Sequence, residues 1–118
     1  MSVDPKCFDA IGVVVDWIDA CKSRRLDTLL DLYAAEATVE CCCEGGTFRG
    51  RAGIEEYWRP RLAESARGAF EIDALLSEPN GVSLDYRGYD GRPVRAHFRF
   101  GDTGKILLTA CAPIKTAA

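Results

Sequence analysis

Six cysteines and a single histidine are the residues of this 118-residue chain best suited to metal or acid–base chemistry. Zinc sites usually contain a Cys-x-x-Cys pair, because two thiolates must reach one tetrahedral ion. The chain has no such pair, since its cysteines are Cys7, Cys21, the run Cys41-Cys42-Cys43, and Cys111. With only His97 to complete a ligand set, the sequence predicts no metal site, and nothing in it indicates a cofactor.

The cysteine run allows more than one interpretation. It continues a stretch of alternating β-type residues, so Cys41 and Cys43 are expected on one face of a strand and Cys42 on the other. Cys41 is then a small apolar residue of the core, a base or nucleophile in a pocket, or a redox-active thiol. The neighbouring Glu40 and Glu44 disfavour the thiolate that the second reading needs.

His97 has the side chain best suited to acid–base chemistry near neutral pH. It alternates with apolar residues in the stretch Val94–Phe100, and it shares the parity of Arg95 and Arg99. Alternation therefore places it on the outward face of a strand. A role at the surface or at a subunit interface is favoured there over catalysis.

Three helices and a set of strands are expected to position these residues. Asp4-Pro5 is a favourable helix start, and apolar spacing predicts a helix over residues 5–23. A short second helix carries Leu26 to Tyr33, and a third spans 52–66, where Pro60 predicts a kink or an early break. The predicted strands cover residues 37–43, 47–49, 69–77, 82–89, 94–100 and 105–113.

Turn signals connect the later strands. Asn80-Gly81 and Asp90-Gly91 lie between alternating runs, which is typical of hairpins and indicates an antiparallel meander. The expected fold class is α+β, with the helices packed on a curved, mainly antiparallel sheet in one domain over residues 1–118. The inward face is expected to be apolar (Val82, Leu84, Tyr86, Val94, Ala96, Phe98 and Phe100) and the outward face polar (Ser83, Asp85, Arg87, Arg95, His97 and Arg99).

Charge and hydropathy exclude several classes of function. The formal net charge is −3, and the basic run at 22–25 is short, so nucleic-acid binding is not expected. Acidic and basic residues interrupt the first 19 residues, and no apolar run is long enough to span a membrane. We therefore expect a cytoplasmic protein with reduced cysteines.

Four segments of the chain together resemble the nuclear transport factor 2-like (NTF2-like) superfamily. They are Trp17–Ala20, Leu26–Glu40, Arg49–Trp58 and Gly104–Ile106. The likeness is strongest to the ketosteroid isomerase-like and SnoaL-like (polyketide cyclase-like) branches. The resemblance implies a cone-shaped, cystatin-like fold with an internal pocket, and a homodimer formed through the convex face of the sheet.

When the isomerase's acid–base residues are carried over position by position, each falls on a residue of another type in this chain. The base falls on Cys41, the oxyanion tyrosine on Trp17, and the protonated aspartate on Ala96, with His97 as a weaker alternative. Tyr33 matches the supporting tyrosine of the second helix, and Trp58 matches a further aromatic partner. A proton shuttle needs a carboxylate within reach of the substrate, so steroid isomerisation is not expected.

The sequence therefore predicts a pocket for a small hydrophobic or cyclic molecule. Its expected walls are Trp17, Tyr33, Val39, Cys41, Trp58, Leu84, Tyr86, Ala96 and Phe98. If the protein is an enzyme, an isomerase or a lyase such as a dehydratase is expected, with Cys41, Tyr33 and Tyr86 as candidate catalytic groups. The alternative is a non-catalytic module for dimerisation or protein interaction.

Overall fold

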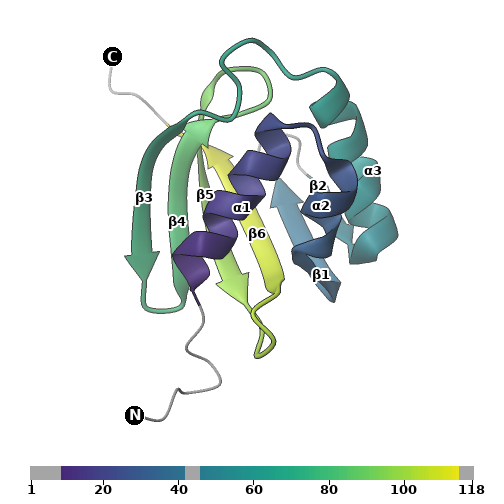
Figure 1. The fold of residues 1–118 in the computed structure, drawn as a ribbon, viewed down its shortest axis with the longest axis vertical. Coiled ribbons are helices and arrows are strands. Elements are labelled where there is room, and N and C mark those ends of the chain that lie inside the picture. The colour runs from purple at the N-terminus through teal and green to yellow at the C-terminus, as the bar shows by residue number, and fades with distance from the viewer. Residues whose placement is uncertain (1–8, 42–45, 115–118) are drawn as a thin grey trace.

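The structure is a computed structural model that describes residues 9–41 and 46–114. Three helices and six strands follow one another along this part of the chain (Figure 1). Their bounds are α1 Ala10–Lys22, α2 Leu26–Asp31, β1 Tyr33–Cys41, β2 Gly46–Arg49, α3 Gly50–Ala63, β3 Ile72–Glu78, β4 Gly81–Arg87, β5 Pro93–Phe100 and β6 Ile106–Pro113. The predicted α+β class is confirmed.

The strands form one six-stranded sheet in the order β2-β1-β6-β5-β4-β3. β3 to β6 make the expected antiparallel meander, but β1 pairs with β6 in parallel, so the sheet is mixed. The helices cover one face of it: α1 packs on β3 and β4, α3 packs on β1 and β2, and α2 lies against both helices (Figure 1). We call the covered face concave and the other face convex.

Both N-terminal helices are shorter than predicted. The carboxylate of Asp9 accepts a 2.9 Å hydrogen bond from the Gly12 N–H, so α1 begins at Ala10, whereas Asp4-Pro5 lies outside the described residues. α2 ends at Asp31 because the Ile106 N–H donates to the Leu32 carbonyl at 2.9 Å and draws the chain into the sheet. Tyr33 is consequently the first residue of β1 rather than the end of a helix.

Of the kink or early break predicted at Pro60, a break at the proline itself does not occur, because α3 continues through it and ends at Ala63, three residues before the predicted end. Pro60 stands in the last turn, where its ring removes a single backbone hydrogen bond, and the buried side chains Trp58 and Leu62 hold the helix on the sheet. β3 begins at Ile72 rather than Ala69, since Phe70 adopts a left-handed backbone (φ 64°) that no strand contains.

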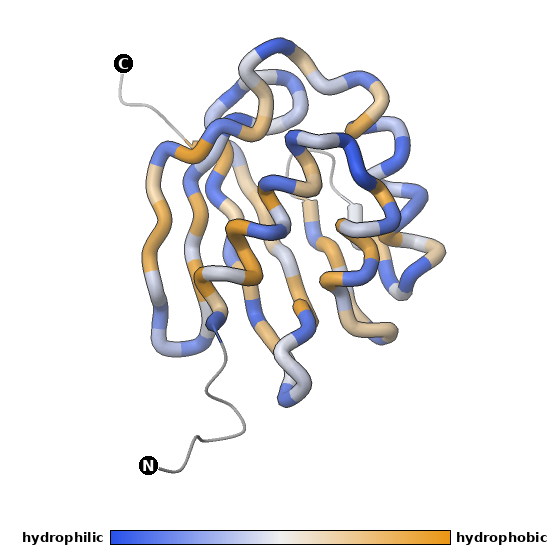
Figure 2. Tube along the Cα trace, viewed as in Figure 1, coloured by the Kyte–Doolittle hydropathy of each residue, from blue (hydrophilic) through white to orange (hydrophobic). Residues whose placement is uncertain are grey.

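The expected alternation of faces is observed on β4 and β5. Val82, Leu84 and Phe98 are at most 1% exposed and face the helices, whereas His97 lies exposed on the convex side. Figure 2 shows hydrophobic and hydrophilic residues alternating along these strands. Ser83 is an exception, because it is buried on the convex face, where it pairs with both Leu76 and His97. No helix in the described ranges is long and apolar enough to cross a membrane.

Candidate functional site

Trp17 occupies the centre of the space between α1 and the sheet. Its ring meets three others edge-on, with centroid distances of 5.4 Å to Trp58, 5.5 Å to Tyr86 and 5.0 Å to Phe98. Edge-to-face contact at these distances is the preferred packing of aromatic side chains. Trp17 is only 1% exposed, so this deep part of the concave face is filled by side chains.

Tyr33 is hydrogen-bonded within the same packed region. Its hydroxyl accepts from Trp17 Nε1 at 3.0 Å and lies 3.2 Å from Thr109 Oγ1. Burial raises the pKa of Tyr33 to about 12, an increase that the hydrogen bonds from Thr109 and Trp17 reduce. The Trp58 N–H also helps to lower this pKa, although it makes no hydrogen bond to any described residue. Tyr33 is thus a neutral, satisfied phenol of the core.

The deep pocket predicted from the sequence is therefore largely closed. In the described part of the chain, six of the nine expected walls line no concave cavity. Tyr33 borders only a surface depression beside α2, and Phe98 borders one beside the β3–β4 turn. Alternation correctly predicted their inward face but carries no information on how completely large side chains fill the space between layers. The six are Trp17, Tyr33, Val39, Leu84, Ala96 and Phe98.

A cavity remains at one end of the concave face, and we call it the open-end pocket. It has a volume of about 200 Å³ and lies between α3, the β4–β5 turn and the ends of β1 and β6, at the top of Figure 1. Cys41, Trp58 and Tyr86 are the expected walls that line it. The other lining residues are Tyr57, Arg61, Phe70, Gly88, Tyr89, Asp90, Arg92, Val94 and Cys111.

Arg61 is the buried cation of this pocket, at 8% exposure. Its Nη1 donates to the Tyr57 carbonyl at 2.5 Å, and its guanidinium lies 3.8 Å from the centroid of the Tyr57 ring. Sequence reasoning missed both residues. The signal was present in α3, because positions 54, 57, 58, 61 and 62 have the spacing of one buried helical stripe.

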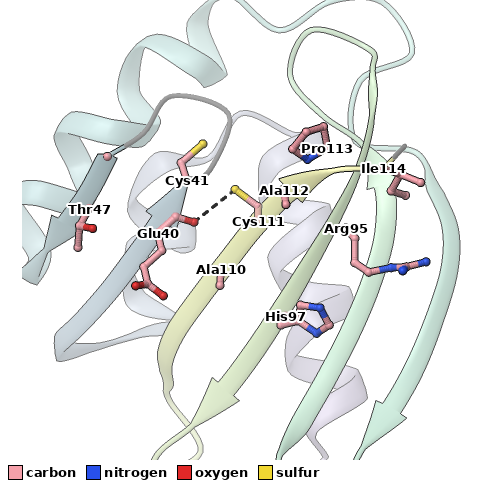
Figure 3. A pocket seen from close by; sticks show the side chains of 11 residues that line it. Glu40, Cys41, Thr47, Arg95, His97, Ala110, Cys111, Ala112, Pro113 and Ile114 are labelled. Atoms are coloured by element: carbon pink, nitrogen blue, oxygen red, sulfur yellow. Dashed lines mark hydrogen bonds between the residues drawn. The ribbon is translucent and has the colours of Figure 1, made fainter. Parts of the chain in front are cut away.

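Two thiols lie side by side at the border of the pocket. Cys41 on β1 and Cys111 on β6 are direct register partners. Cys111 Sγ lies 3.9 Å from the Tyr57 hydroxyl and donates to the Glu40 carbonyl at 3.6 Å (Figure 3). Cys42 and Cys43 lie outside the described residues, and within the described ranges no three potential ligands gather for a metal ion.

Tyr57 and Tyr86 line the open-end pocket as neutral phenols at physiological pH. Burial raises the pKa values of Tyr57 and Tyr86 above their ordinary range, and the nearby Cys111 and Cys41 raise them further. Among the described lining residues the only carboxylate is that of Asp90, whose Oδ2 lies 3.9 Å from Arg92 Nε. These residues therefore offer hydrogen-bond donors rather than a strong base.

Comparison with known families shows to which family the chain belongs. Residues 14–108 match the family model of the SnoaL-like domain. The chain belongs to the SnoaL-like domain family. Comparison with the curated proteins finds no match.

Solved structures place this SnoaL-like domain among NTF2-like and ketosteroid isomerase-like folds. A SnoaL-like protein of unknown function from Burkholderia thailandensis is 26% identical, with a TM-score of 0.80, over 90% of this chain and 95% of that one. A putative polyketide cyclase from Sinorhizobium meliloti is 21% identical, with a TM-score of 0.69, over 89% and 100%. A Catenulispora acidiphila protein with a ketosteroid isomerase-like fold, in complex with trimethylamine, is 20% identical, with a TM-score of 0.70, over 85% and 83%.

The convex face of this SnoaL-like domain carries a second, larger depression of about 680 Å³, which we call the convex groove (Figure 3). Ala110 and Ala112 of β6 form part of its floor, with Glu40 on one side and Arg95 and His97 on the other. Several of the charges beside the groove are paired. Arg95 binds both Asp85 oxygens at 2.7 and 2.9 Å, which lowers the pKa of Asp85, and His97 Nδ1 lies 2.9 Å from Glu78 Oε1.

Proposed function

We propose that this SnoaL-like domain binds a small, largely apolar molecule in the open-end pocket. The observation that carries the proposal is a cavity lined by five aromatic rings and a few polar side chains, the kinds of group that line small-molecule sites. Its volume of about 200 Å³ is below the range typical of drug-sized ligands, so the molecule is small.

The chemistry of the lining favours binding over proton abstraction. Tyr57 and Tyr86 are neutral donors, and the rim carboxylate of Asp90 lies beside Arg92. If a reaction occurs here, we infer an isomerisation or elimination in which Cys41, as a thiolate, accepts the proton and Tyr86 donates a hydrogen bond to the developing negative charge. The positions that hold acid and base in the isomerase resemblance are occupied by Trp17, Cys41 and Ala96, which gives no support to steroid isomerisation.

A pocket-filling variant tests the proposal. Val94 lines the open-end pocket, so Val94→Phe adds a ring to the cavity, whereas Ala112→Phe adds the same ring to the convex face of the neighbouring strand. Binding of fluorobenzene is followed by ¹⁹F NMR. We expect wild type and Ala112→Phe to bind the probe and Val94→Phe to lose at least tenfold in affinity; equal binding by all three would refute the site.

A second function, self-association through the convex face, is favoured by the charge arrangement of the convex groove. The acidic Glu40 flanks the alanines of β6 on one side, and the basic Arg95 flanks them on the other. A two-fold axis through such a groove would set the acidic flank of one copy against the basic flank of the other. Leu76 on the same face is 64% exposed and would be covered.

Sedimentation equilibrium tests this homodimer. Ala110→Arg places a long cation in the middle of the groove, and Glu56→Arg introduces the same cation on the exposed side of α3 as a control. We expect a dimer for wild type and the control, and a monomer for Ala110→Arg. A monomeric wild type at high micromolar concentration would exclude the proposal.

A further inference from the structure

The hydroxyl of Tyr86 is a donor at the open-end pocket without a hydrogen-bond partner in the described part of the chain. Tyr86 is 5% exposed and lines the pocket, and its hydroxyl makes no hydrogen bond to any described residue. The hydroxyl oxygen is not sealed off from the cavity, so a ligand acceptor can reach it.

The position of this donor is fixed by the rings around it. Tyr86 meets the edge of Trp17 at 5.5 Å and an angle of 87°, and it stacks with Phe70 at 6.4 Å and 14°. Both partner rings are at most 2% exposed, so the phenol ring cannot swing away. A donor held in this way loses little conformational freedom when a ligand binds.

The charge state of Tyr86 is also fixed. Burial raises its pKa well above the ordinary value of 10.0, and Cys111, Cys21, Tyr33 and Cys41 all act in the same direction. The hydroxyl therefore stays protonated at physiological pH and acts as a donor toward an acceptor, such as a carbonyl oxygen.

The size of the pocket limits what the acceptor is attached to. An engineered apolar cavity of about 150 Å³ in another protein binds benzene. At about 200 Å³, the open-end pocket has room for one ring and a short substituent. Trp58, Phe70 and Tyr57 supply the ring surfaces for such a ligand to pack against.

The buried cation does not call for an anionic ligand. Arg61 Nη1 already donates to the Tyr57 carbonyl, and the guanidinium also lies over the rings of Tyr57 and Tyr89. From these observations we propose that the ligand class is a neutral, single-ring molecule with a carbonyl-type acceptor, which Tyr86 binds by donating a hydrogen bond. This inference rests on the proposed function of the open-end pocket.

A pair of matched probes tests the inference. Acetophenone carries a carbonyl next to its ring, and ethylbenzene has a similar shape without the acceptor. Dissociation constants for both are measured by NMR titration of wild type, Tyr86→Phe and Tyr33→Phe, the last removing a phenol that lies outside the open-end pocket. We expect Tyr86→Phe to weaken acetophenone binding by about five- to tenfold, the worth of one hydrogen bond, and to leave ethylbenzene within about twofold. Tyr33→Phe should leave both affinities within about twofold.

Three other results of these titrations would contradict the inference. If Tyr86→Phe weakens both probes equally or neither, the pocket binds apolar molecules and the role of Tyr86 is wrong. If wild type binds benzoate more tightly than acetophenone, the neutral ligand class is wrong. If wild type binds no probe up to its solubility limit, the inference and the proposed function both fall. Because Tyr86→Phe keeps the ring, its thermal midpoint should be equal to or above that of wild type, which shows that the variant is folded.

Discussion

Tyr33 and Tyr86 are two buried phenols of one concave face, and they differ in how their hydroxyls are satisfied. The Tyr33 hydroxyl is bound by Trp17 and Thr109 in the packed interior. The Tyr86 hydroxyl lies at the open-end pocket and has no hydrogen bond to the described residues. Satisfied polar groups stabilise a core, whereas unsatisfied ones at a cavity are available to a ligand.

The two tyrosines show that matching the isomerase resemblance and facing the open-end pocket are separate properties of a residue. Tyr33 is the residue that matches the isomerase resemblance, yet the surrounding rings close its end of the concave face. Tyr86 lies on β4, outside the carried-over set, and faces the space that remains. We infer that this domain binds at the open end of the concave face, because the deep end is filled by packed rings.

The largest expected effect is the loss of stability when the packed ring of the deep end is removed. Trp17→Ala removes a fully packed ring and should lower the free energy of unfolding by about 3–5 kcal/mol. Val15→Ala on the same helix is the control, because Val15 is 41% exposed and its loss should cost less than about 1 kcal/mol. Urea denaturation measures both. A cost below about 1 kcal/mol for Trp17→Ala would show that the deep end is not packed.

Alkaline pH should destabilise the protein through Tyr33. Its pKa is about 12 in the folded state against an ordinary 10.0, so above pH 10 the unfolded chain loses this proton first. The contribution of the neutral Tyr33 phenol to the free energy of unfolding is fully present below pH 10. It should fall by about 3 kcal/mol between pH 10 and 12. Denaturation at several pH values checks this, and Tyr33→Phe should show a slope smaller by about 1.4 kcal/mol per pH unit. An unchanged slope would contradict the burial of Tyr33 as a neutral phenol.

Removing one hydroxyl from each phenol compares the two ends directly. Tyr33→Phe leaves the buried Trp17 N–H without its acceptor and should cost about 1–3 kcal/mol at neutral pH. Tyr86→Phe breaks no hydrogen bond with the described residues and should cost nothing. Chemical denaturation of both variants provides the measurement, and equal costs would remove the distinction between the two ends.

The smallest expected difference between the deep end and the open end is in the reactivity of their cysteines. Cys21 is fully buried in the deep end, and burial raises its pKa, so alkylation by iodoacetamide should leave it intact in the native protein. Cys111 at the open-end pocket is partly exposed and should be modified first of these two. Peptide mapping by mass spectrometry reads out the order, and modification of Cys21 before unfolding would contradict it.

Local patterns in the sequence were sufficient for much of the fold. Period-two alternation correctly placed the inward and outward residues of β5, and Asn80-Gly81 correctly located a turn. Gly81 is required there, because a Cβ would lie 1.8 Å from the Phe98 carbonyl oxygen. Long-range features were not predictable in this way. The parallel pairing of β1 with β6 joins segments about seventy residues apart, and no local pattern encodes it.

The candidate site was predictable only in part. Alternation and helical spacing identified Cys41, Trp58 and Tyr86 as inward residues, and all three line the open-end pocket. The depth of the pocket could not be predicted, because it depends on how the rings around Trp17 fill the interior. Phe70 was also missed as a wall, since its left-handed backbone ends what the sequence pattern presents as a continuous strand.

The most direct test of ligand binding at the open end uses the two indole N–H resonances of the chain, one from Trp17 and one from Trp58. Titration with fluorobenzene is followed in ¹H–¹⁵N spectra, and a Trp58→Phe variant assigns the two signals. Trp58 lines the open-end pocket, whereas the Trp17 N–H is bound to Tyr33 beneath it. We predict that the Trp58 resonance shifts saturably and several-fold more than that of Trp17. No saturable shift, or a larger shift at Trp17, would contradict it.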